Sequence, residues 1–66
     1  MASDKPTIGE RLIAARGDRS IKAVAEAVGI TSQALCMYEH DKRVPRDEIK
    51  VKLAAYYKRS ISALFF

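Results

Sequence analysis

The stretch from Ser20 to Leu35 constrains the fold of this chain more than any other feature. In it a small residue, Ala25, is followed four positions later by Gly29, and Leu35 comes six positions after that. Ala25 lets two helices approach closely, and Gly29 can adopt the positive φ that ends the first helix. With Ser20 and Thr31 as N-caps, this spacing is typical of two short helices crossing at roughly 90–120°. A helical hairpin used only for packing is the alternative.

The helical period also runs through the rest of the chain. Apolar residues recur three and four apart almost throughout, which predicts five helices and no strands, an all-α fold class. The first helix follows the capping-box pair Thr7 and Glu10, and the last, Ile61–Phe66, is short. We therefore expect a flexible tail over residues 1–6 and one domain over residues 7–66.

Size and charge favour a binding face over a catalytic cleft. The chain has 66 residues, with 12 Lys and Arg against 8 Asp and Glu, and this net charge of +4 suits a polyanionic partner. The sequence contains no paired carboxylates, no nucleophile with a base, no phosphate loop and no metal-ligand spacing. We therefore expect no catalytic residue, no cofactor, no metal and no small-molecule substrate.

The single cysteine and the N-terminal residues indicate the compartment. Cys36 has no second cysteine to pair with, and neither a signal peptide nor an apolar run of the roughly 18 to 20 residues that span a membrane is present. These features predict a cytoplasmic protein without a membrane partner. Cys36 is interpreted as a bystander thiol rather than a redox sensor, because only His40 stands near it in sequence. His40 itself is expected at the surface or on a phosphate.

Residues 20–39, SIKAVAEAVGITSQALCMYE, resemble the Xre family of phage repressor and Cro-type regulators. Lys42-Arg43-Val44-Pro45 resembles the family's basic turn, and residues 49–65 resemble its two closing helices. The resemblance implies a compact five-helix, lambda-repressor-like domain with a helix-turn-helix. It also implies a double-stranded DNA operator as partner, bound by a homodimer of phage or mobile-element type.

Two positions depart from the family pattern. The link over residues 17–19 is about two residues shorter than is common, and Ile21 stands where the family often has a glutamine that contacts phosphate. Ser20, Lys22 and the amide end of the second helix are expected to substitute for that contact.

The helix Thr31–His40 is expected to enter the major groove, where its first turn reaches the base edges. The leading reader is Gln33, whose amide can pair with adenine at two atoms and so contribute about 1 to 3 kcal/mol of discrimination. Met37 lies on the same face and would touch a thymine methyl, pack against a partner or contact nothing. Base readout is assigned to Ser32, Gln33, Ala34 and Met37.

Cations and helix caps lie on both sides of this helix in the sequence. Contacts to phosphate are expected from Arg19, Ser20, Lys22, Thr31, Lys42, Arg43 and Arg46. For each charged residue of this set the alternative is a solvated surface. The assignment predicts that log affinity falls against log salt with a slope near −0.9 per phosphate neutralised. By resemblance, Arg16 and Glu39 form a structural ion pair, and Tyr38 is expected in the core.

The apolar C-terminus has two interpretations. Ile61, Leu64 and Phe65 could close the core, whereas Phe66 is harder to bury, and we assign Phe65 and Phe66 to a dimer interface. The predicted function is a sequence-specific transcriptional repressor. The alternative is a protein-interaction module of the same fold, such as an antitoxin or anti-repressor, and binding to duplex DNA would distinguish the two.

Overall fold

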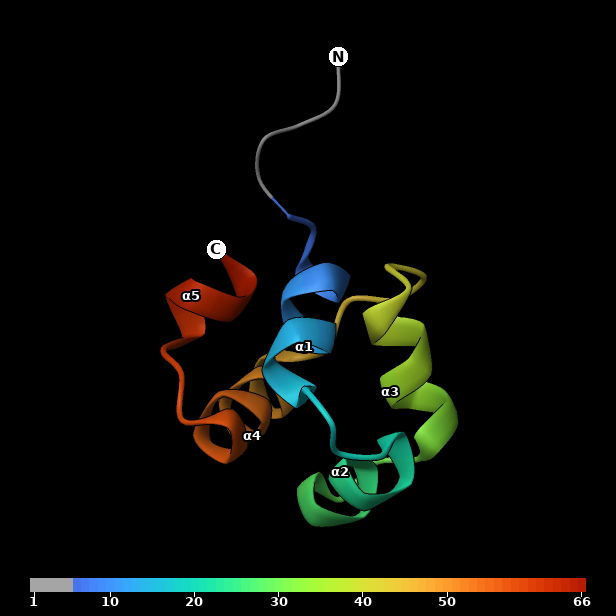
Figure 1. Cartoon of the computed structure of the whole chain (residues 1–66). Coiled ribbons are helices and arrows are strands. Elements are labelled where there is room, and N and C mark those ends of the chain that lie inside the picture. The colour runs from blue at the N-terminus through green and yellow to red at the C-terminus, as the bar shows by residue number, and fades with distance from the viewer. Residues whose placement is uncertain (1–5) are drawn as a thin grey trace.

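The computed structural model describes residues 6–66, and in this range the chain forms five α-helices and no strand (Figure 1). They are α1 (Ile8–Arg16), α2 (Ile21–Val28), α3 (Ser32–Glu39), α4 (Asp47–Tyr57) and α5 (Ile61–Phe65). The predicted all-α class and helix number are confirmed. The tail predicted over residues 1–6 lies outside the described residues apart from Pro6. None of the described helices is long and apolar enough to cross a bilayer.

The helix boundaries follow from the capping residues. Thr7 and Glu10 form the predicted capping box at the start of α1. The hydroxyl oxygens of Ser20, Thr31 and Ser60 each accept a hydrogen bond of 3.0 Å from the amide three residues later. Gly29 ends α2 in the left-handed region, with φ 87°. Local sequence thus determines where α2 stops and α3 begins.

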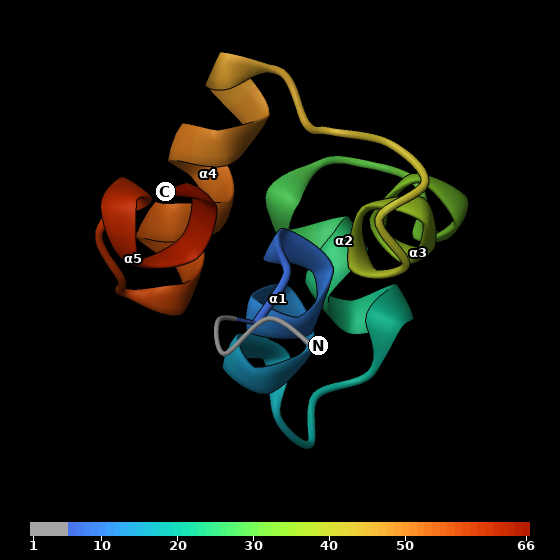
Figure 2. The ribbon, with the colours of Figure 1, turned by 90° about the horizontal axis from the view of Figure 1, so that it is seen from above.

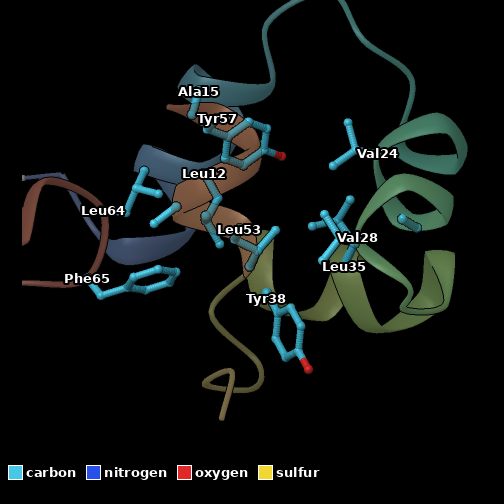
Figure 3. Close-up of a cluster of buried hydrophobic side chains, with 12 residues drawn as sticks. Leu12, Ala15, Val24, Val28, Leu35, Tyr38, Leu53, Tyr57, Leu64 and Phe65 are labelled. Atoms are coloured by element: carbon cyan, nitrogen blue, oxygen red, sulfur yellow. The ribbon is translucent and has the colours of Figure 1, made fainter. Parts of the chain in front are cut away.

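Every helix contributes one large, fully buried aliphatic side chain to a single core (Figure 3). These residues are Leu12, Val24, Leu35, Leu53 and Leu64. Tyr38 is buried as predicted, at 7% exposed. Phe65 is also in the core, at 5% exposed, so little of its side chain is accessible for the dimer contact predicted from the sequence. Of the two phenylalanines, only Phe66 therefore has an exposed side chain.

Helix α1 lies between α3 and α5 in both views of the ribbon (Figures 1 and 2). It packs on each of them, while α2 packs on α3 and α4. The outer surfaces of α3 and α5 therefore belong to opposite sides of the molecule. This arrangement leaves room for two separate contact surfaces.

The hydroxyl of Tyr57 is buried, and among the described residues it has no hydrogen-bond partner. Burial, and then the negative charge of Glu39, raise the pKa of Tyr57 from its ordinary value of 10.0 to about 12. An unpaired buried hydroxyl contributes nothing to stability, so we expect Tyr57→Phe to leave the free energy of unfolding unchanged at pH 7 or to raise it by up to about 1 kcal/mol.

The pH dependence of Tyr57→Phe gives a second measurement. The folded state holds the phenol proton more tightly than the unfolded chain does, so wild-type stability should decline as the pH rises from 10 towards 12. Urea titrations at pH 7 and pH 11 should show a smaller decline for Tyr57→Phe. A loss of more than about 1 kcal/mol at pH 7 would mean that the hydroxyl has a partner after all.

Candidate nucleic-acid interface

Helix α3 is buried on one side and open at its first turn. Leu35 is 0% exposed and Tyr38 is buried, which fixes the inner face of the helix on the core. Thr31, Ser32 and Gln33 are exposed at its N-terminal end. Helix α3 is therefore anchored to the core through its buried side, and the first turn, which is predicted to carry base readout, is accessible to a ligand.

A shallow surface hollow brings together side chains from α3 and from the turn that follows it. It is lined by Thr31, Gln33, Ala34, Met37 and Arg43. Three of the four residues assigned to base readout and two of those assigned to phosphate thus share one surface. Ser32, the fourth, is exposed on the same first turn but does not line the hollow. Ala34 and Met37 are half-buried, so only part of each is accessible to a ligand.

An ion pair fixes the far end of α3 against α1. The guanidinium of Arg16 donates from Nε to Oε2 of Glu39 at 2.7 Å and from Nη2 to Oε1 at 3.1 Å. Glu39 is buried, and the hydrogen bond to it raises the pKa of Arg16 above its ordinary range. The pair that the resemblance implied is therefore present, and the two-point geometry of arginine and carboxylate sets an angle as well as a distance.

Gly9 and Asp41 add a second junction between α1 and the end of α3, and neither was identified from the sequence. The amide of Gly9 donates to Oδ1 of Asp41 at 2.9 Å, and Gly9 lies directly against the backbone of Glu39. Hydrogen bonds from the Thr7 side chain and the Gly9 amide lower the pKa of Asp41. A glycine inside a helix costs about 1 kcal/mol relative to alanine, which was the available signal for Gly9. Asp41 gave no such signal.

The residues assigned to phosphate contacts differ in the contacts that their side chains already make within the protein. The hydroxyls of Ser20 and Thr31 accept their capping bonds and still have a proton to donate. Lys22, Lys42, Arg43 and Arg46 are exposed and take part in no ion pair among the described residues. The guanidinium of Arg19, however, lies 5.3 Å from the ring centre of Tyr56 and 5.6 Å from that of Tyr57. Arg19 is thus held against α4 by cation–π contacts.

Cys36 and His40 are one helical turn apart, close in sequence to the residues predicted to carry base readout. His40 Nδ1 lies 2.8 Å from the carbonyl oxygen of Cys36 and 3.5 Å from its Sγ. One ring nitrogen of His40 is therefore already engaged with a backbone carbonyl at the C-terminal end of α3. Over residues 6–66, no three side chains of His, Cys, Asp or Glu cluster in a way that could hold a metal ion.

Comparison with known proteins identifies a family and two similar structures. A family model described as helix-turn-helix matches residues 11–64. The crystal structure of the P22 c2 repressor in complex with a synthetic operator superposes with a TM-score of 0.89 at 24% identity, covering 92% of this chain and 96% of that chain. The solution structure of the DNA-binding domain of the P22 c2 repressor gives a TM-score of 0.86 at 23% identity, covering 94% and 84%. A search of curated proteins finds no match.

Proposed function

The chain belongs to the helix-turn-helix family, and on that premise we propose that it is a cytoplasmic, non-catalytic repressor that binds operator DNA through α3. The observation that carries the proposal is the asymmetry of α3. Its inner face is buried in the core, and its first turn presents Thr31, Ser32 and Gln33 to solvent beside Arg43. A helix held in this way can lie in the major groove with its N-terminal residues on the base edges.

Sequence readout is assigned to polar and apolar groups of one surface. The Gln33 amide can both donate and accept, so it can pair with N6 and N7 of an adenine. The Ser32 hydroxyl can bond to several bases and specifies less. Ala34 and Met37 offer apolar atoms to a thymine methyl. The P22 c2 repressor, which has the same fold, has been crystallised with a synthetic operator, and this supports duplex DNA as the ligand.

Contacts to phosphate would fix the register of α3 in the groove. We assign them to the hydroxyls of Ser20 and Thr31 and to the exposed cations Lys22, Lys42, Arg43 and Arg46. Arg19 is exposed but lies against two tyrosine rings, so it is less free than Arg43 to turn towards a phosphate. Its contribution to DNA affinity should therefore be smaller than that of Arg43.

We expect Gln33→Ala to relax the preference for one base pair in each half-site, because the variant loses its two-point contact with adenine. Selection of bound sequences from random duplexes should give the wild-type site, and Gln33→Ala should lose about 1 to 3 kcal/mol of discrimination at one position. Lys52→Gln, an exposed change on α4, is the control and should leave the preference intact. If Gln33→Ala selects the same site with the same stringency, the readout assignment is wrong. If wild type binds no duplex at all, the repressor function fails.

The repressor is proposed to act as a homodimer, with Phe66 at the contact. Phe66 is 78% exposed and Val51 is 53% exposed, and together with Ile61 they line a hollow between α4 and α5. Two copies related by a twofold axis would place their α3 helices on half-sites about 34 Å apart. The exposed apolar side chains are the surface that such a contact would cover.

We expect Phe66→Asp to weaken assembly and operator affinity together, because a carboxylate would have to be desolvated in an apolar contact. Sedimentation equilibrium should show at least a tenfold rise in the dimer dissociation constant, equivalent to about 1.4 kcal/mol. Ser62→Asp, an exposed change on α5 with the same added charge, is the control. Unchanged sedimentation of Phe66→Asp would remove this surface from the dimer.

A further inference from the structure

A hollow is lined by side chains of α1 and α5. Helix α5 lies on the other side of α1 from α3 (Figure 1). The walls of the hollow include Ala14 and Ala15 of α1 and Ala63 and Leu64 of α5. Small side chains from both helices make the floor apolar. The two flanking residues with the longest side chains are arginines, Arg11 of α1 and Arg59 of the α4–α5 link.

The charge at this hollow is unbalanced. Among the described residues, neither Arg11 nor Arg59 forms an ion pair. The one carboxylate on the rim, Glu10, accepts the Thr7 amide at 2.8 Å through Oε1, so it is committed to the start of α1. Among the described residues, two guanidinium groups and this one capping carboxylate therefore line one apolar depression, and the charge of its lining is net positive. An anionic ligand could give each guanidinium a two-point partner.

We propose that this α1–α5 hollow is a docking site for an acidic peptide segment of a partner protein. The segment would place one aliphatic side chain on the alanine floor and flanking carboxylates on Arg11 and Arg59. The apolar part of the hollow and its two arginines each favour a different feature of this peptide. The alanine floor favours an aliphatic side chain over a sugar-phosphate backbone, and the arginines favour carboxylates over a neutral apolar peptide.

The position of the hollow allows the partner and DNA to bind together. Helix α3 and helix α5 pack on different sides of α1, so a peptide at α5 leaves the first turn of α3 uncovered (Figures 1 and 2). The inference goes beyond the proposed function, because it assigns a protein ligand to a surface that DNA readout does not use.

The test is a titration of the full chain with a synthetic six-residue peptide, capped at both ends, that has two central leucines and two acidic residues on each side. Amide resonances in ¹H–¹⁵N spectra should shift at Ala14, Ala63 and Leu64 and stay in place at Ser32 and Gln33. Arg11→Glu and Arg59→Glu should each weaken the fitted affinity at least about fivefold, because an attractive pair becomes a repulsive one. Lys52→Glu, with the same change of charge on exposed α4 surface, should change it less than twofold.

Two further experiments test whether binding depends on the shape of the hollow and whether the ligand is a peptide or a nucleic acid. Ala14→Gln fills the hollow without altering charge and should weaken peptide binding, and the peptide with glycine in place of leucine should bind more weakly to wild type. The proposal is overturned by the absence of shifts at α1 and α5. It is also overturned if Lys52→Glu weakens binding as much as Arg59→Glu. If Arg11→Glu and Arg59→Glu instead weaken binding to random-sequence duplex as much as Arg43→Glu does, the surface is a nucleic-acid surface.

Discussion

Gly9→Ala is expected to lower the free energy of unfolding by about 2 to 3 kcal/mol, although alanine is the better helix former. A Cβ on residue 9 would lie 2.7 Å from the carbonyl carbon of Glu39 and 3.0 Å from Oδ2 of Asp41. The first contact is with backbone, which cannot rotate away as the end of a side chain can. Helices α1 and α3 would therefore have to separate, and this would stretch the Gly9–Asp41 hydrogen bond and the Arg16–Glu39 pair.

The sign of the effect makes Gly9→Ala informative. Helix propensity alone predicts a gain of up to about 1 kcal/mol, whereas the packing of α1 on α3 predicts a loss. Thermal unfolding should show a midpoint lower by about 10 to 20 °C in a domain of this size. Ala55→Gly, at an exposed position in α4, is the control for propensity and should lose only about 1 kcal/mol. A Gly9→Ala variant as stable as wild type would show that α1 and α3 are not packed this closely.

The elements that could be predicted from the sequence are those encoded by neighbouring residues. The caps at Ser20 and Thr31 and the positive φ at Gly29 act within four or five residues, and the helices begin and end where these residues indicate. The inner face of α3 was also predictable, because Leu35 and Tyr38 are three apart and so share one side of a helix. The exposed side of α3, to which we assign DNA readout, followed from it.

The contacts that orient α3 on the rest of the molecule were less predictable. Asp41 bonds to Gly9 across 32 positions of sequence, and no local pattern at either residue specifies the other. Arg19 appeared available for phosphate because it precedes a helix, but Tyr56 and Tyr57, which hold it, are far along the chain. Phe65 was assigned outward for a similar reason. The depth of the core beneath a five-residue helix depends on how α4 and α5 pack, which periodicity within α5 does not show.

The largest functional effect is expected from removing both cations of the turn after α3. Lys42 and Arg43 are exposed on either side of Met37, and each lines a hollow that Met37 also lines. In the double variant Lys42→Gln, Arg43→Gln a dimer would lose four phosphate contacts. We expect operator affinity at 0.15 M salt to fall on the order of 100-fold, and the slope of log affinity against log salt to become shallower by about 3.6.

The effect should be independent of sequence, because contacts to phosphate hold the helix in register without reading bases. Operator and random duplex should therefore weaken by similar factors in the double variant, whereas Gln33→Ala should weaken the operator alone. The control is the double variant Lys52→Gln, Arg59→Gln, which removes the same charge from exposed surface on α4 and the α4–α5 link. If that control lowers affinity as much as Lys42→Gln, Arg43→Gln does, the attraction comes from net charge and the turn after α3 does not lie on the DNA backbone. A steep salt slope retained by the Lys42 and Arg43 variant would lead to the same conclusion.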